Sequence, residues 1–192
     1  DRERAPSPDT TGFCRRRTNR VAMTDEIPER AAKTFDAHDA FERDDDAFLV
    51  TTSRFESRVT AADTDDWALE YTLTVRAPML SSATADEVGD AGESGWFDTY
   101  ERRLEDAPMA TRADVELDDL TVTEEDGEAV AEFTFEYGNA DHAPEVAKAM
   151  AEYVEGTYVE GAVPGYDYEG VVADLLGEAS SAGQGQGTGT PL

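Results

Sequence analysis

The stretch Trp67-Ala68-Leu69-Glu70-Tyr71-Thr72-Leu73-Thr74-Val75-Arg76 decides the fold, because its apolar and polar side chains alternate without a break. Alternation with a period of two places one set of side chains on each face of a β-strand. The apolar set is Trp67, Leu69, Tyr71, Leu73 and Val75. Such a one-sided pattern is typical of an antiparallel sheet that has one covered face and one face in water.

Four more segments on either side of this stretch carry strand patterns. Before it, residues 48–52 are short and apolar, and residues 55–59 alternate in period two. After it come residues 113–123 and 128–137, which are separated by a turn containing Asp126-Gly127. Because Asp-Gly favours the tight turn of a two-residue hairpin, we expect these last two strands to pair.

Apolar residues at helical spacing predict three helices and a shorter one near the C-terminus, at residues 28–38, 95–105, 142–158 and 169–178. The order of elements is therefore α-β-β-β-α-β-β-α followed by a short C-terminal helix. Hairpins with helices inserted between them indicate an α+β fold. We expect an antiparallel sheet of about five strands with the helices packed on one face.

The charge of the chain is strongly unbalanced. Its 192 residues include 44 acidic and 16 basic ones, which gives a formal net charge of −28, and only two of the basic residues are lysines. The acids are spread along the chain and 39% of residues are hydrophobic, so a core is expected beneath them. Dense salt screens the repulsion between such charges. We therefore expect a halophilic protein with an acidic surface.

Composition also excludes several classes of partner and site. There is no basic stripe to meet phosphates, so direct binding of nucleic acid is not expected. Cys14 is the only cysteine, which excludes an intrachain disulfide and a thiolate metal site. No run of 18 apolar residues exists, so we expect no membrane span and a cytoplasmic location. No cofactor is indicated.

Three regions differ in composition. Residues 1–22 hold six arginines and two prolines, and we expect them to be disordered. They form either a real basic arm or upstream sequence translated from a misplaced start, and we favour the second explanation because Met23 begins a stretch typical of a natural start. Residues 23–179 are expected to form one α+β domain. Residues 180–192 are rich in Gly, Ser and Gln and predict a flexible tail.

Three stretches carry a family resemblance: MTDEIPERAA at residues 23–32, GWFDTYERRLEDA at 95–107 and YVEGTYVEGAVPGYDY at 153–168. With them the chain resembles a haloarchaeal family of unknown function over roughly residues 23–179. This resemblance implies a haloarchaeal cytosolic protein and brings no activity, cofactor or catalytic residue. Separately, the order of elements resembles that of secretion chaperones, which are dimeric binding modules. That analogy implies a homodimer with a protein or peptide partner.

The region rich in tyrosine and glycine at residues 153–168 is the main candidate site. Its tyrosines and the aromatic residues of the helix at 95–105 are candidates for the lining of a groove for a peptide or another ligand. The residues of this predicted groove are Trp96, Tyr100, Tyr158, Tyr166 and Tyr168. The alternative is that the glycines permit turns and the tyrosines pack with their hydroxyls at the rim, which we consider the better explanation.

Other titratable residues have simpler explanations than catalysis or metal binding. His38 and His142 each lie at a predicted helix end and lack a metal-type partner. The acidic runs 44–46 and 124–126 fall at turns and do not match the spacing of a calcium loop. We expect Arg102 and Arg103 to pair with neighbouring acids. No catalytic motif is present, so the catalytic residues, if any, are unknown.

These observations favour a non-catalytic binding or chaperone-like protein. The alternative is a small-molecule enzyme that uses carboxylate or tyrosine chemistry in a pocket near Tyr166. An enzyme of this kind needs a buried carboxyl group with a raised pKa, and the sequence does not single one out among the 44 acids.

The charge yields a direct prediction about folding. Transfer from molar to millimolar KCl should loosen or unfold the protein, because the Debye length grows from about 3 Å at 1 M to about 30 Å at 0.01 M and the acids then repel one another. Far-UV circular dichroism across a KCl series measures the change. A spectrum that stays the same at low salt would contradict the prediction.

Overall fold

The computed structural model describes residues 27–184, and the strands in this range form one six-stranded antiparallel sheet in the order β1-β2-β3-β4-β6-β5. The strands are β1 (Phe41–Asp44), β2 (Ala47–Val50), β3 (Glu56–Asp63), β4 (Leu69–Pro78), β5 (Asp119–Glu125) and β6 (Glu128–Tyr137). The helices are α1 (Glu29–Asp36), α2 (Leu80–Ala83), α3 (Asp90–Leu104), α4 (Ala143–Glu160) and α5 (Gly170–Gln184), with short 3-10 turns η1 (Ala107–Ala110) and η2 (Ala140–His142). Residues 1–22, discussed above, lie outside the described range.

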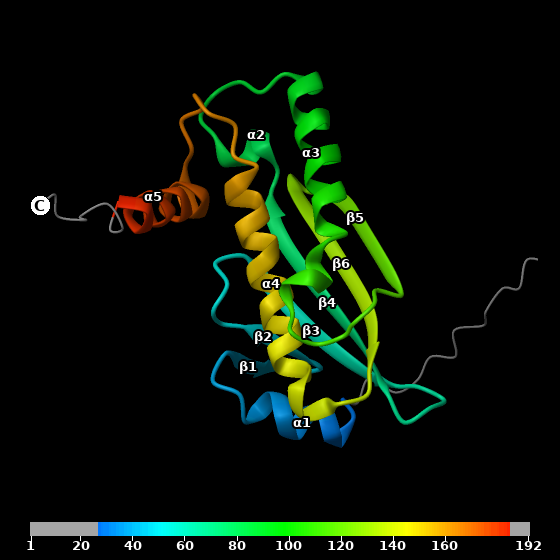
Figure 1. Cartoon of the computed structure of the whole chain (residues 1–192). Helices are drawn as coiled ribbons and strands as arrows, with labels where there is room; N and C mark the ends of the chain where they lie inside the picture. Colours follow the sequence, from blue (N-terminus) through cyan, green and yellow to red (C-terminus); the bar gives the residue numbers. More distant parts are fainter. Residues whose placement is uncertain (1–26, 185–192) are drawn as a thin grey trace, which may run out of the picture.

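The sheet has one covered and one open face. Helices α1, α3 and α4 lie on the same side of it, and α5 stands apart beside the C-terminal half of α4 (Figure 1). On β4 the burial alternates strictly, with Leu69, Tyr71, Leu73 and Val75 buried under the helices and their neighbours half-buried. The predicted α+β class with helices on one face is therefore confirmed. The additional strand is β1, a four-residue segment whose single buried apolar residue gave no alternation to detect.

The pairing of β4 with β6 builds the centre of the core. Tyr71 lies opposite Phe135 and Leu73 lies opposite Phe133, and all four side chains are fully buried. The rings of Tyr71 and Phe135 stack with their centroids 5.6 Å apart. Burial of a large side chain contributes about 1.5–3 kcal/mol, so these four residues are a principal source of stability.

The predicted hairpin between β5 and β6 is confirmed. Asp126 and Gly127 both have positive φ, at 51° and 83°, which is the requirement of the type I′ turn that Asp-Gly favours. The strands that this turn joins pair from Asp119 opposite Thr134 to Glu125 opposite Glu128.

The apolar face of β4 begins at Leu69, so the placement of Trp67 on that face was wrong. Trp67 is 73% exposed and precedes the strand. Its ring lies against Gly138, where an added Cβ would come within 1.9 Å of a ring carbon. Its backbone oxygen accepts a hydrogen bond from the Arg30 guanidinium at 2.8 Å. The alternating sequence pattern includes Trp67, but this residue lies in the turn between β3 and β4.

Several element bounds also differ from the sequence prediction, including the start of α3 at Asp90 and the end of β3 at Asp63. Residues 113–118 are not a strand; β5 starts at Asp119, and the Asp118 carboxylate instead accepts the backbone N–H of Glu136 at 2.8 Å. Helix α5 continues past the expected end at residue 178 to Gln184. The hydroxyls of Ser180 and Ser181 donate to the carbonyls of Leu176 and Gly177, one turn earlier, which is compatible with helix.

The buried hydroxyl of Tyr71 makes the stability of the fold decrease at alkaline pH. Burial raises the pKa of its hydroxyl to about 12, with the charge of Arg30 opposing the increase and Tyr137 adding to it. The unfolded chain loses this proton near pH 10, so between about pH 10 and 12 the folded state holds more protons and its stability falls as pH rises. Tyr71→Phe should therefore make the free energy of unfolding fall less steeply above pH 10. Urea titrations from pH 8 to 11 measure it, and identical slopes for both proteins would contradict it.

Candidate functional site

A cavity of about 640 Å³, here called the α4 cavity, lies between the N-terminal half of α4, the loop after η1 and the end of β6. Tyr137, the last residue of β6, also lines it. The α4 wall includes the residue just before the helix and consists of His142, Glu145, Val146, Lys148, Ala149 and Glu152. The loop wall consists of Ala110, Thr111, Arg112 and Ala113.

Local sequence explains how both walls are held. Pro144 lies in the first turn of α4, where its missing N–H is tolerated. Glu145, Ala149 and Glu152 follow at intervals of three or four residues and so share one side of the helix. In the loop, the Thr111 hydroxyl lies 3.0 Å from the carbonyl oxygens of both Pro108 and Ala113 and thereby fixes the segment that carries Arg112.

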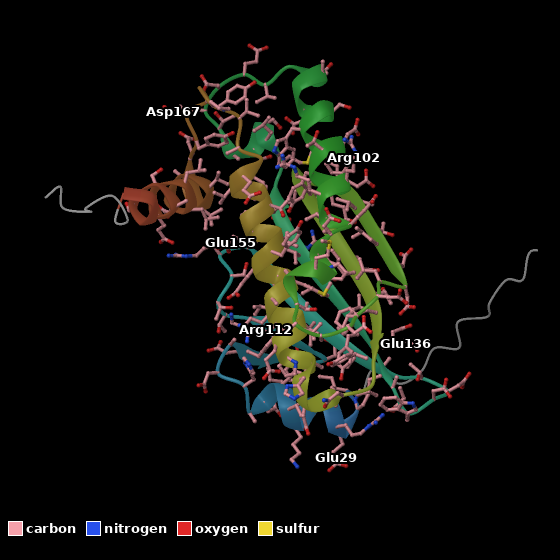
Figure 2. The ribbon with its side chains drawn as sticks, in the orientation of Figure 1. Glu29, Arg102, Arg112, Glu136, Glu155 and Asp167 are labelled. Carbon is pink, nitrogen blue, oxygen red and sulfur yellow. The ribbon has the colours of Figure 1, made fainter. Side chains whose placement is uncertain are left out.

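The charges of the α4 cavity are only partly matched. Lys148 pairs with Glu152 along the helix, and the Nδ1 atom of His142 lies 4.0 Å from a carboxylate oxygen of Glu145. Arg112 is exposed and forms no ion pair with any residue in the range 27–184. Figure 2 shows Arg112 beside the N-terminal half of α4, far from Arg102 on α3. The cavity therefore combines apolar walls with one cation that lacks a carboxylate partner.

Three residues of the predicted aromatic groove lie together inside the core. Trp96 and Tyr100 are stacked with their centroids 5.2 Å apart, and the ring of Tyr158 meets both edge-on at 5.3 and 5.8 Å. All three are buried, and the Tyr158 hydroxyl donates to the Pro78 carbonyl at 3.0 Å. A cavity of only about 20 Å³ lies beside Trp96 and Tyr100, which is room for about one water molecule.

The other two residues of the groove lie in the connection between α4 and α5. Tyr166 and Tyr168 contact each other edge-on at 6.4 Å. The Tyr168 hydroxyl meets the backbone of Val163, and its own backbone bridges to Thr84. This arrangement matches the packing alternative, in which tyrosines keep their hydroxyls at the rim. A peptide groove around these five residues stays a prediction.

Of the other candidate residues from the sequence, His38 and Asp44 make contacts that support the fold. His38 follows α1, and its Nδ1 accepts the backbone N–H of Ala40 at 3.2 Å. In the acidic run 44–46, Asp44 pairs with Arg58 at 3.1 Å. The expected pairing of Arg102 and Arg103 with neighbouring acids was wrong, since neither forms an ion pair with a described residue.

Sequence reasoning missed the α4 cavity. Lys148 is one of only two lysines in the chain, but Lys33 also lies in a helix, so the position of Lys148 carried no signal. Arg112 carried no signal of its own, because it is separated from α4 by the whole β5–β6 hairpin. His142 was considered alone and without the residues that the fold brings next to it.

The carboxylates do not form a specialised centre in the described part of the chain. Within residues 27–184 no Asp or Glu is buried, and no group of three potential ligands is placed to hold a metal ion. The helices in that range are also too short or too polar to cross a membrane. The acids therefore lie on the surface, as their even spread along the sequence predicts.

The fold and the site define a single-sheet α+β protein with a cavity between its longest helix, the loop after η1 and the end of β6. The chain belongs to a family of unknown function (DUF5813), whose model matches residues 36–178. The matched range contains the complete sheet, helices α3 and α4 and all residues of the α4 cavity, and it begins at the last residue of α1. No curated protein and no solved structure matches the chain.

Two tyrosines of the aromatic cluster provide a matched test of its packing. Tyr158→Phe should destabilise the protein by about 1 kcal/mol, because the half-buried Pro78 carbonyl loses the hydrogen bond from the Tyr158 hydroxyl. Tyr100→Phe should be close to neutral, because the buried Tyr100 hydroxyl has no partner among the described residues. Urea unfolding of both variants in molar KCl measures the difference. Equal losses would show that the two hydroxyls are not in the different environments described.

Proposed function

We propose that this protein is a non-catalytic binding module whose ligand occupies the α4 cavity. The observation that carries the proposal is the cavity itself. Its volume of about 640 Å³ lies within the range of about 300–1,000 Å³ typical of small-molecule sites. Its lining combines apolar residues such as Ala113 and Ala149 with charged ones such as Arg112, and small-molecule sites likewise combine apolar surface with polar groups that orient the ligand.

The exposure of the carboxylates favours binding over catalysis. The carboxylate enzyme considered from the sequence needs a buried carboxyl group that keeps its proton, and no Asp or Glu in residues 27–184 is buried. The two carboxylates of the cavity, Glu145 and Glu152, lie seven residues apart on one helix, about 10 Å along its axis. Glu152 has Lys148 as its neighbour and Glu145 has His142, so the two carboxylates do not converge on one reacting group.

The volume of the α4 cavity also favours a small ligand over an unfolded protein segment, because it lies within the range typical of small-molecule sites. We therefore propose a small organic ligand in place of the peptide partner expected from the order of elements. The homodimer implied by the same analogy stays a prediction.

We further propose that the protein works in concentrated salt. Its net charge of −28 and the exposure of its acids support this proposal, since screening by salt makes such a surface tolerable. The haloarchaeal origin and the cytoplasmic location expected from the sequence remain predictions.

Binding in the α4 cavity is tested with an uncharged apolar dye, N-phenyl-1-naphthylamine, in molar KCl. The dye should show saturable fluorescence with one site per chain. Ala149→Trp fills the cavity from its α4 wall and should weaken binding at least about tenfold, equivalent to ~1.4 kcal/mol. Ala91→Trp, an exposed helical alanine of α3, is the control and should bind like the parent protein.

Both tryptophan variants must show the parent's circular dichroism spectrum, so that a lost site is distinguished from a lost fold. Failure of the dye to saturate the parent protein would overturn the proposed function. Equal binding by the Ala149→Trp variant would place the ligand elsewhere.

A further inference from the structure

We infer that the ligand of the α4 cavity is a small organic monoanion with an apolar body, and that Arg112 holds its charge. This inference rests on the proposed function and adds the chemical class of the ligand. It follows from the distribution of cations in the described chain, the pairing of the acids in the cavity and the apolar surface between them.

Cations without a carboxylate partner are few in the described range. Ten Lys and Arg residues lie in residues 27–184, and six of them form ion pairs with carboxylates there. The four others are Lys33, Arg102, Arg103 and Arg112. Of these four, Arg112 alone lines the α4 cavity. Arg103 lines only the cavity of about 20 Å³ beside Trp96, so Arg112 is the one of these four at a space large enough for an organic ligand.

The chemistry of Arg112 suits a carboxylate-like group. A guanidinium offers five N–H donors in a planar fork, always carries its charge, and pairs with a carboxylate through two parallel hydrogen bonds. The described structure provides Arg112 with no hydrogen-bond acceptor. The loop that carries Arg112 is held by Thr111, so the guanidinium approaches the cavity from a fixed backbone position.

The acids of the cavity limit the charge of the ligand. Glu152 is engaged by Lys148, and Glu145 lies 4.0 Å from the Nδ1 atom of His142. Both carboxylates lie on the α4 wall and would repel a second negative charge on the ligand. One anionic group on the ligand, placed at Arg112 on the loop wall, is the arrangement that gives Arg112 a partner and brings no further charge close to the two carboxylates.

The remaining lining favours an apolar body. Val146 and Ala149 on α4, Ala113 on the loop and the ring of Tyr137 offer carbon surface that water cannot hydrogen-bond. Removing such surface from water contributes favourably in proportion to its area. The ligand therefore joins one charged group to a hydrocarbon or aromatic portion.

Four probes with the same naphthalene body and different charge test this inference in molar KCl at pH 8. They are 2-naphthoate, 2-naphthyl phosphate, 2-naphthalenemethanol and 2-naphthylmethylammonium, which carry one negative, two negative, no and one positive charge. We expect 2-naphthoate to bind about tenfold more tightly than the uncharged alcohol, because a charge-assisted hydrogen bond contributes a free energy of about that size. The phosphate and the ammonium probe should bind more weakly than 2-naphthoate.

Arg112→Ala should remove the advantage of 2-naphthoate over the alcohol and leave binding of the alcohol within about twofold of the parent. Arg112→Lys keeps the charge but loses the planar fork, so it should retain only part of that advantage. Arg102→Ala is the matched control, because Arg102 is also exposed and without an ion pair in the described range but lies outside the cavity. Arg102→Ala should leave all four affinities unchanged.

The outcomes separate this inference from the proposed function. If the alcohol binds and 2-naphthoate has no advantage, or if Arg112→Ala changes nothing, the monoanion assignment is overturned while the binding function stands. Tighter binding of the phosphate or the ammonium probe would also overturn the assignment. If none of the four probes binds, both the function and the ligand class are overturned.

Discussion

The register between β4 and β6 is the constraint on which the rest of the structure depends. Along this pair Leu69 lies opposite Tyr137, and the pairing continues without interruption to Pro78 opposite Glu128. A shift by one residue would turn every side chain of one strand to the other face and expose the buried rings. The helices pack against the surface that this register creates, so their positions follow from it.

The α4 cavity is a consequence of the same register. Because Tyr137 ends β6 on the covered face, the chain reverses there through η2 and enters α4, which runs back across the sheet (Figure 1). The loop after η1 enters β5 beside the same strand. Two segments far apart in the sequence, one with Arg112 and one with Lys148, are thereby brought to opposite walls of one space.

The strands and helices with strong local periodicity could be predicted from the sequence, and the site could not. The alternation from Leu69 to Val75 and the turn at Asp126-Gly127 are local signals, and both proved correct. Trp67 continues the same alternation but was misplaced. The pairing of β4 with β6 ends where Leu69 lies opposite Tyr137, so Trp67 has no partner residue on β6. The cavity depends on contacts between segments without a common local pattern. Its residues therefore carried no signal that spacing alone could detect.

A strongly acidic surface and the proposed binding of an anion in the α4 cavity are compatible because the two act over different distances. The field of the net charge of −28 is long-ranged, and salt at about 1 M reduces its reach to roughly 3 Å. A hydrogen bond from Arg112 acts at contact, and the apolar walls of the cavity exclude part of the water and ions that would weaken it. Concentrated salt therefore removes the repulsion of an approaching anion more completely than it removes the attraction at the site. Under those conditions the ligand is selected by the few groups that it touches, and the charge of the whole protein contributes little.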